Sequence, residues 1–317
     1  MCGIAGHFGR PVGADVRHRM RAALLKRGPD AQHLAVFDAA GTRLPDDAVG
    51  AVGLVHTRLS IIDPRPDADQ PMGTDEGALW ICYNGEVYGW QDDARQLADR
   101  GVHFHTWSDT EFILRGYEAW GIEGLLPRLR GMFAFAIVDF RTRRVHVVRD
   151  RLGLKPIVYA HRNDGFAFGS TVRSVLPWLP RSERGLSPAS IDAYLAHRYV
   201  PAPRTIFTHI ARLPNAHRLE YELDTGRLSE HRWWSPRPAA AHDLGALLDE
   251  AIALRLVADR PLGLFLSGGI DSGTIACRLA ATGHAGLHSF SAAFPGSSFD
   301  ESAEAAATAQ ALHLPNE

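Results

Sequence analysis

The sequence predicts two domains of different class: an α+β domain of sheets packed with helical layers, followed by an α/β domain with a parallel sheet. Its 317 residues suggest about two domains, at roughly 100–200 residues each. In the first part of the chain, strand patterns follow one another with helices between them. After residue 243, strand and helix alternate, which is typical of a parallel sheet.

The first part of the chain is rich in runs of β-branched and aromatic residues, which are typical of strands. Two stretches between these runs show helical periodicity instead, and each ends at a glycine, as helices often do. The predicted strands are 53–63, 79–88, 132–140 and 144–150, and the predicted helices are 92–101 and 110–121.

Proline-rich stretches interrupt these patterns at 176–188 and 199–207, and HRWWSPRPAAAH at 231–242 is a further break. We therefore expect a first domain over 2–205, a connecting segment over 206–242 and a second domain over 243–317. The second domain is predicted to contain helices at 243–257, 271–283 and 300–312, with strands at 262–266 and 287–294.

Charge and cysteine content narrow the class of protein. The net charge of −2 gives no reason to expect binding to nucleic acid or to an acidic membrane surface. No apolar run has the roughly 18 residues of a membrane helix, and the N-terminus has no secretory signal pattern. The three cysteines are few and odd in number, which argues against a disulfide framework. Such cysteine usage indicates a reducing compartment, the cytoplasm. Cys82 and Cys277 lie in apolar contexts and are interpreted as packing residues.

A glycine-rich loop joins the first predicted strand of the second domain to the helix after it. In LFLSGGIDSG, Gly268 and Gly269 have no Cβ, so a phosphate can approach the backbone closely. The amides at the start of the helix carry partial positive charge, and Ser267 and Ser272 add hydroxyl donors. Asp271 either caps the helix or helps to hold Mg²⁺. The alternative is a plain glycine turn capped by Asp271 or Ser272, but the full Ser-Gly-Gly-Ile-Asp-Ser pattern between an apolar strand and a helix favours an anion site.

The N-terminal sequence MCGIAG places a cysteine directly after the initiator methionine. Chain ends are usually exposed, so a buried structural cysteine is not expected at position 2. If Met1 is removed, Cys2 carries both a thiol and an α-amine with a pKa of about 7.7–8.0. Such an amine can take the thiol proton, directly or through a water. The sequence therefore predicts a nucleophile at Cys2.

Three further segments supply groups that attack on an amide requires. The Asn84 side chain and the Gly85 N–H can both point at one oxyanion, although Asn-Gly is also a common hairpin turn. Arg58 can grip a carboxylate through two bonds, or make a surface ion pair. Asp109 can accept an ammonium, or cap the helix that begins beside it.

These motifs occur in one order that resembles the class II glutamine amidotransferases, whose nucleophile is an N-terminal cysteine. With LFLSGGIDS, which is similar to the PP-loop of the ATP pyrophosphatases, the whole chain resembles the glutamine-hydrolysing asparagine synthetase family. The resemblance implies an N-terminal-nucleophile hydrolase fold, an αββα sandwich, followed by the start of a PP-loop ATP pyrophosphatase domain. The motifs are MCGIAG, KRGPD, RLSIID, YNGEVY, SDTE, LRGMFAFAIVD and RDRLGLKPIVY.

The resemblance also implies roles for individual residues. Cys2 would attack the glutamine side-chain amide, with Asn84 and Gly85 as the oxyanion hole. The ammonia released would convert an ATP-activated acceptor carboxylate, aspartate in this family, to an amide, with Mg²⁺ accompanying ATP. A homodimer is also compatible with the family. The residues expected to bind glutamine are Arg58, Leu59, Ser60, Ile61, Ile62, Asn84, Gly85, Glu86 and Asp109, and those expected to contact ATP are Leu266, Ser267, Gly268, Gly269, Ile270, Asp271, Ser272 and Ala292.

Other functions stay open at this point. The acceptor can be a cell-envelope sugar or a natural-product carboxylate, because the family's acceptor-binding segments lie beyond HLPNE, where this chain ends. We therefore expect a complete glutaminase site and an incomplete synthetase half. A hydrolase for another amide is disfavoured by the pairing of Arg58 with Asp109, which suits an amino acid. A truncated regulatory protein is the non-enzymatic alternative.

Overall fold

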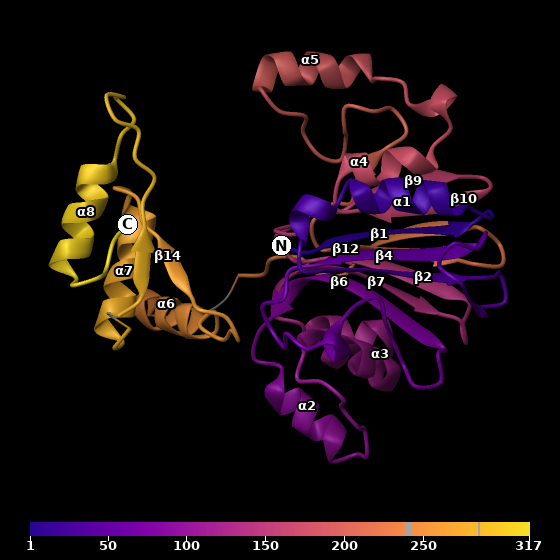
Figure 1. Ribbon diagram of the computed structural model, residues 1–317, viewed down its shortest axis with the longest axis horizontal. Helices are drawn as coiled ribbons and strands as arrows, with labels where there is room; N and C mark the ends of the chain where they lie inside the picture. Colours follow the sequence, from indigo (N-terminus) through magenta and orange to yellow (C-terminus); the bar gives the residue numbers. More distant parts are fainter. Residues whose placement is uncertain (239–242, 285) are drawn as a thin grey trace. The chain divides into compact units, whose positions relative to one another are not determined.

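The computed structural model describes residues 1–238, 243–284 and 286–317. The chain divides into two compact units, Met1–Pro236 and Arg237–Glu317 (Figure 1). In the first unit, two antiparallel sheets lie face to face, with helices on both outer faces. The expected αββα sandwich is therefore confirmed.

The first sheet has seven strands in the order β11-β9-β10-β1-β4-β2-β3, and the second has six in the order β13-β12-β8-β7-β6-β5. The central strand β1 pairs with β10 on one side and β4 on the other. In the first sheet the strands are β1 (Gly3–Gly9), β2 (Ala31–Phe37), β3 (Arg43–Leu44), β4 (Val52–Arg58), β9 (Val158–Arg162), β10 (Gly165–Gly169) and β11 (Ala211–Arg212). In the second they are β5 (Met72–Gly73), β6 (Leu79–Val87), β7 (Gly131–Asp139), β8 (Arg144–Arg149), β12 (His217–Glu222) and β13 (Leu228–Arg232).

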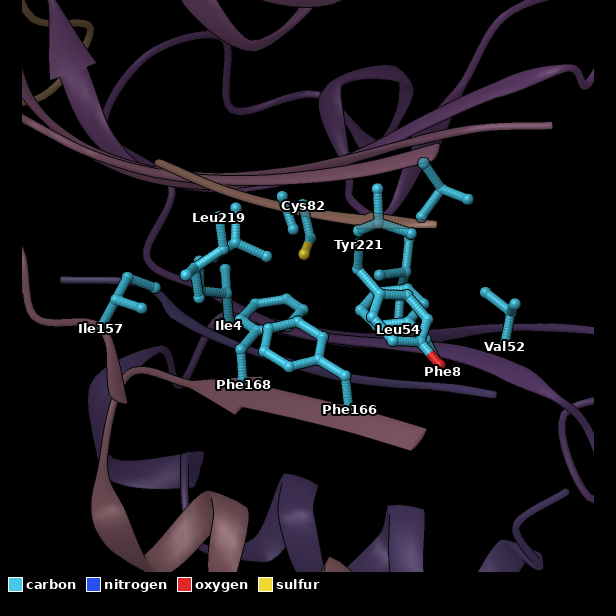
Figure 2. Close-up of a cluster of buried hydrophobic side chains, with 14 of the residues drawn as sticks. Ile4, Phe8, Val52, Leu54, Cys82, Ile157, Phe166, Phe168, Leu219 and Tyr221 are labelled. Atoms are coloured by element: carbon cyan, nitrogen blue, oxygen red, sulfur yellow. The ribbon is translucent and has the colours of Figure 1, made fainter. Parts of the chain in front are cut away.

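The main hydrophobic core lies between the two sheets (Figure 2). Phe8, Phe166 and Phe168 stack on one another from the first sheet, with ring centroids 5.9–6.5 Å apart. Cys82 faces them from β6 and is fully buried, as expected of a packing residue. Alternate residues of β6 and β7 instead face the helices, so both strands are buried on both faces.

Helices cover the outer faces of both sheets. α1 (Ala14–Ala22) and α4 (Val172–Val175) pack on the first sheet, and α2 (Gln91–Ala98) and α3 (Asp109–Leu125) cover the second. Gly121 ends the expected helix at 110–121, but here it takes a φ of 63° inside α3, and helical turns continue after it. The remaining helical segments are α5 (Pro188–His197) and the 3₁₀ turns η1 (Leu25–Arg27), η2 (Pro66–Ala68), η3 (Leu126–Arg128), η4 (Leu176–Trp178) and η5 (Arg181–Glu183).

The structure also differs from the sequence predictions at 53–63 and at 206–242. The strand expected over 53–63 ends at Arg58, because the following residues turn back around the Arg58 side chain. The segment 206–242 is not a simple connection: it contributes β11, β12 and β13, and β12 pairs with β8 inside the second sheet. The first unit therefore extends to Pro236 rather than to 205. Residues 239–242 of that segment lie outside the described residues.

The second unit is a small α/β layer, as predicted. β14 (Gly263–Phe265) and β15 (His288–Phe290) pair in parallel, and α7 (Ile270–Ala281) connects them. α6 (Leu244–Ala253) and α8 (Ser302–Ala311) complete the unit, and Ala276, Ala305 and Ala309 are fully or almost fully buried in its core.

Cys277 does not pack in this core, contrary to the sequence prediction. It is exposed, because it follows the buried Ala276 by one residue and so lies about 100° around the helix from it. Among the described residues, no helix is long and apolar enough to cross a membrane.

Candidate active site

A cavity of about 140 Å³ in the first unit brings together segments that are far apart in the sequence. A single water needs roughly 10–15 Å³ of such space, so the cavity can hold a small organic molecule. Most of the residues predicted to form a glutamine site line it: Cys2, Arg58, Leu59, Ile61, Ile62, Asn84, Gly85, Glu86 and Asp109. Ser60 is absent from the lining, because its N–H is turned to Asp30 Oδ2 at 2.7 Å.

Cys2 lies just before β1, with its sulfur beside the residue that follows β4. Sγ accepts from the Leu59 N–H at 3.4 Å and lies 3.7 Å from the Leu59 carbonyl. Gly3 allows this approach, since a Cβ there would lie 2.6 Å from Thr57 Oγ1. The start of β1 is therefore packed against the end of β4, and the thiol is held at the cavity rather than left on a loose chain end.

The KRGPD segment supports the nucleophile from the other side. Arg27 Nε donates to the Cys2 carbonyl at 3.0 Å. Gly28 packs on β4 so closely that a Cβ would lie 2.2 Å from the Thr57 carbonyl oxygen. Asp30 holds the backbone at Ser60. The motif thus ties the N-terminus to the loop that lines the cavity.

Burial changes the proton affinities of the two groups at the N-terminus in opposite directions. It raises the pKa of the Cys2 thiol, although the Leu59 N–H partly offsets this. It lowers the pKa of the α-amine, which belongs to Met1 in this chain. The Cys2 sulfur and Asp30 partly offset this effect, and Arg27 and Lys155 add to it. A protonated thiol therefore stands beside an amine that readily becomes neutral, which is the pairing that a base and its nucleophile need.

Asn84 and Gly85 lie inside β6 and not in a hairpin turn, which excludes that alternative. Asn84 is 1% exposed, and its Nδ2 has no hydrogen-bond partner among the described residues. An unpaired buried donor costs about 1–3 kcal/mol, so its presence at a cavity indicates a ligand that accepts from it. Gly85 pairs with Phe133 of β7 so closely that a Cβ would lie 2.4 Å from the Met132 carbonyl oxygen.

Asp109 is a buried carboxylate at the first turn of α3. Ser108, and not Asp109, caps this helix by accepting from the Glu111 N–H. Asp109 Oδ2 accepts from the Tyr83 hydroxyl at 2.6 Å and from the Val87 N–H at 3.0 Å. No cation among the described residues pairs with it, and burial raises its pKa to about 6. A ligand ammonium would supply the missing positive charge.

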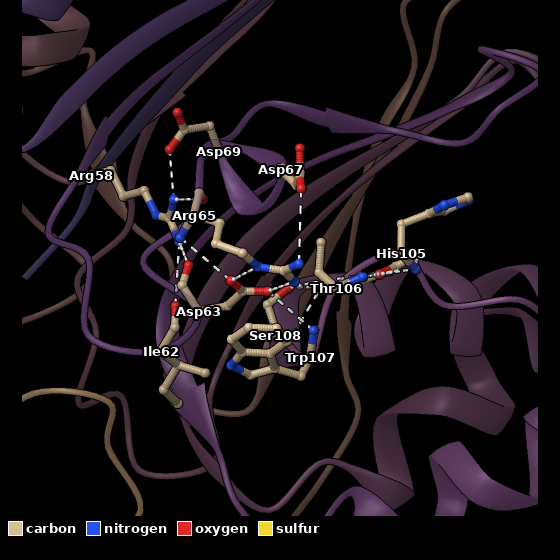
Figure 3. A network of polar contacts seen from close by, with 11 residues as sticks. Arg58, Ile62, Asp63, Arg65, Asp67, Asp69, His105, Thr106, Trp107 and Ser108 are labelled. Carbon is tan, nitrogen blue, oxygen red and sulfur yellow. Dashed lines mark hydrogen bonds and ion pairs between the residues drawn. The ribbon is translucent and has the colours of Figure 1, made fainter.

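Arg58 is the centre of a polar network in the loop after β4 (Figure 3). Its two Nη atoms donate to the carbonyls of Arg65, Ile62 and Asp63 and to Asp69 Oδ1. The buried Asp63 carboxylate binds Arg65 through two 2.7 Å bonds. Arg58 lines the cavity, but four acceptors of the protein already engage it, so a ligand carboxylate would have to replace one of them.

Sequence reasoning missed several residues of the lining. Gln70 links two walls, since its Oε1 accepts from the Tyr83 N–H at 2.6 Å and its Nε2 donates to Thr110 at 3.1 Å. Nothing in the local sequence around Gln70 indicates this role. Lys155 also lines the cavity. It lies within the motif RDRLGLKPIVY, but the sequence predicted no role for this residue. Ala68, Tyr83, Ser108, Thr110 and Met132 also line the cavity.

In the second unit, the glycine-rich loop follows β14 and leads into α7. Ser267 and Ser272 contact each other through their hydroxyls at 3.0 Å, and Gly269 caps the helix without a side-chain bond. Neither Asp271 nor Ser272 is therefore the N-cap that the plain-turn alternative required. The Gly268 N–H donates to the Glu301 carboxylate at 3.2 Å, so one loop amide already binds an anionic group.

The remaining residues predicted to contact ATP differ in exposure. Leu266 is buried, whereas residues 267–271 are all exposed. Ala292 was expected on the second strand, but β15 ends at Phe290, and Ala292 is an exposed residue just beyond it. Among the described residues, no group of three or more His, Cys, Asp or Glu side chains is arranged to hold a metal ion.

Comparison with protein families identifies both parts of the chain. Residues 1–234 match the model of a glutamine amidotransferase domain, and residues 243–317 match that of asparagine synthase. The first match also places the domain limit close to Pro236.

Curated relatives share about 30% identity with the chain. A putative glutamine-hydrolysing asparagine synthetase of Methanocaldococcus jannaschii is 29% identical, over 95% of this chain and 61% of the relative. One from Mycobacterium tuberculosis is 32% identical, over 98% and 50%. An amidase of Gibberella zeae is 30% identical, over 87% and 42%. The chain thus spans about half the length of the curated relatives it matches.

Solved structures agree on the fold. The Bacillus subtilis glutamine phosphoribosylpyrophosphate amidotransferase, complexed with ADP and GMP, superposes with a TM-score of 0.55 at 17% identity. The superposition covers 100% of this chain and 65% of that one. At this identity the likeness supports the fold alone.

Proposed function

We propose that this chain, which belongs to the glutamine amidotransferase domain family, hydrolyses the side-chain amide of glutamine at Cys2 and supplies ammonia to an acceptor. The observation that carries the proposal is one cavity lined by the Cys2 thiol, Asn84 and the Asp109 carboxylate. Among the described residues, Asn84 Nδ2 has no hydrogen-bond partner and no cation pairs with Asp109. These three groups match the reacting amide, its oxyanion and the substrate ammonium.

The reaction begins once Met1 has been removed. The α-amine of Cys2 takes the thiol proton, and Sγ attacks the amide carbon. Asn84 Nδ2 and the Gly85 N–H stabilise the oxyanion, and each such donor is typically worth about 3 kcal/mol. When the C–N bond breaks, the proton held by the amine leaves with ammonia, and a thioester remains on Cys2. Water then hydrolyses the thioester to glutamate and the free thiol.

The ends of the substrate would be held on either side of the reacting amide. Asp109, with Glu86 nearby on β6, accepts the α-ammonium. Arg58 takes the α-carboxylate by exchanging one of its present acceptors, and Leu59, Ile61 and Ile62 line the pocket beside it. The backbone of Ser60 keeps this loop in place through Asp30.

We propose in addition that the second unit binds ATP with Mg²⁺ at residues 266–272, and that the acceptor is aspartate. ATP supplies activation of the acceptor carboxylate by adenylation. Support comes from the loop amide of Gly268, which already binds a carboxylate, and from Asp271 in the first turn of α7. One or two carboxylates beside substrate phosphates are a usual setting for Mg²⁺. Ala292 would contact ATP from beyond β15. The unpaired cysteines favour a cytoplasmic location.

A second candidate is amidotransfer to another acceptor, such as a natural-product carboxylate or a cell-envelope sugar. The amidase among the relatives favours this second candidate, because it shows that proteins about 30% identical to this chain are not all named asparagine synthetases. Its glutamine site would be the same, so only acceptor assays separate the two candidates.

Glutamate release from glutamine tests the proposal, measured with and without ATP and aspartate. The unaltered chain and Cys277→Ala should release glutamate, whereas Cys2→Ala should not. The exposed Cys277 makes its variant a matched control for loss of a thiol. Intact mass must first establish that Met1 is absent. Equal inactivity of the unaltered chain and Cys2→Ala after Met1 removal would refute the glutaminase. Asparagine formation would support aspartate as the acceptor. Because the chain spans about half the length of its curated relatives, glutamate without asparagine would not count against aspartate.

A further inference from the structure

Lys155 is a buried cation that the proposed mechanism does not use. It is 6% exposed and lines the same cavity as Met1, Cys2 and Glu86. Its ammonium makes no ion pair with a carboxylate of the described residues. Burial lowers the pKa of this ammonium, and Glu86, the Cys2 sulfur and Asp150 partly offset that effect. Lysine is rarely buried unless it is paired, so an unpaired lysine at a cavity calls for a functional reason.

The fold holds Lys155 at this place through the carboxylate of Asp150. Asp150 is fully buried and accepts from the N–H groups of Leu152, Leu154 and Lys155 at 2.9–3.1 Å. It also accepts from the Phe133 N–H at 3.3 Å, and Phe133 is the strand partner of Gly85. The loop that carries Lys155 is thereby fastened to the strand pair that presents the oxyanion donors.

The same loop is held from its other side by Arg149. Its guanidinium donates to the carbonyls of Lys155 at 2.9 Å and of Gly153 at 2.6 Å. Backbone groups of the loop are thus fixed by a carboxylate on one side and a guanidinium on the other. With its backbone held in this way, Lys155 lines the cavity.

Lys155 is close enough to influence both groups of the nucleophile. It interacts electrostatically with the α-amine of Met1 and with the Cys2 sulfur. The backbone nitrogen of Cys2, which becomes the α-amine once Met1 is removed, lies between these two groups along the chain. The other charged groups that face the amine are Arg27 and Asp30, together with the Cys2 thiol itself. Arg58 and Asp109 face the thiol. At the amine, burial and the cations Arg27 and Lys155 lower the pKa, whereas the Cys2 sulfur and Asp30 raise it.

We propose that Lys155, with Arg27, keeps the α-amine of mature Cys2 in its neutral form, so that this amine can accept the thiol proton. Lys155 is thus a positioning residue that acts through the amine. A positive charge beside an amine disfavours the ammonium, because like charges repel. This inference rests on the proposed glutaminase, but it concerns a proton equilibrium that can be measured without turnover.

The chain offers an unusually clean test, since its only lysines are Lys26 and Lys155. In a chain with Cys2→Ala and Met1 removed, ¹³C-methylation of the amines gives three signals: the α-amine and two lysines. We expect Lys155→Met to raise the pKa of the α-amine by roughly 0.5 unit or more, because it removes a positive charge that lines the same cavity. Lys155→Arg and the exposed Lys26→Met should leave it unchanged. Lys155→Gln is a second neutral variant that keeps a polar tip.

Activity provides the second readout, in the chain that retains Cys2. Lys155→Met should move the acid limb of the kcat/KM profile for glutamine to higher pH by the same amount, and Lys155→Arg should restore its position. An α-amine pKa that Lys155→Met and Lys155→Gln do not move overturns the inference. So does a higher KM with an unmoved acid limb, which would make Lys155 a ligand of the substrate carboxylate. Absence of glutaminase in the unaltered chain would count against the proposed function and leave the amine titration as a separate result.

Discussion

Replacing Asp109 by asparagine should stabilise the first unit while it damages glutamine hydrolysis. Burial raises the pKa of this carboxyl from 3.8 to about 6. The folded state therefore binds more protons than the unfolded state between these values, and stability falls as pH rises through them. A shift of about two units corresponds to roughly 3 kcal/mol at pH 7.5, where the carboxylate is charged in both states. Asparagine removes this cost, so Asp109→Asn should gain up to about 3 kcal/mol, and about half of that at pH 5.

Urea unfolding followed by tryptophan fluorescence is the appropriate assay. All seven tryptophans lie at or before position 234, so the signal reports the first unit alone. Asp139→Asn is the matched control. Asp139 is also buried, which raises its pKa, but hydrogen bonds from Arg141 and Thr142 together with the Arg141 charge outweigh this and lower the pKa, so this change should destabilise the unit at pH 7.5. Asp109→Asn should also lower kcat/KM for glutamine by roughly 10–100-fold, through loss of a charged hydrogen bond. The reasoning is refuted if Asp109→Asn is no more stable than the parent at pH 7.5, or if its gain does not shrink at pH 5.

Three further predictions follow from individual contacts. Gly85→Ala would place a Cβ 2.4 Å from the Met132 carbonyl oxygen, so we expect a loss of roughly 1–3 kcal/mol in the urea assay and loss of glutaminase; unchanged stability would contradict the register of β6 on β7. Asp150→Ala should cost at least about 3 kcal/mol in the same assay, because the N–H groups of four residues lose their acceptor, and a cost below about 1 kcal/mol would contradict this. A thiol reagent should label the exposed Cys277 at once and Cys2 more slowly, and glutamine should protect Cys2; mass spectrometry that finds native Cys82 labelled would disagree with its full burial.

Much of the fold could be predicted because local patterns and tertiary packing agree there. The runs at 79–88, 132–140 and 144–150 became β6, β7 and β8, since their residues are apolar on both faces and lie between a sheet and helices. The prediction failed where an apolar pattern continued along the sequence but the pairing with neighbouring strands ended. RLSIID has the apolar character of a strand, yet the chain leaves β4 at Arg58 to surround that side chain. The segment 206–242, expected to be a connection, contains β12, whose pairing with β8 joins residues far apart in the sequence, such as Arg218 and Val148. No local signal records such a pairing.

The sequence by itself determined the chemical groups of the candidate site: an N-terminal thiol, an amide donor, a carboxylate and a glycine-rich loop. It did so because residues within a motif answer to the local backbone geometry. Gly3 and Gly28, for example, allow their segments to pack closely against Thr57. The tertiary structure alone decided the electrostatic state of those groups. Within the part of the chain that the structure describes, Asn84 Nδ2 has no partner, no cation pairs with Asp109, and Lys155 lines the same cavity. All three facts depend on what other strands and loops bring to the cavity. Burial and neighbouring charge set proton affinity, and both arise only when segments distant in the sequence pack together.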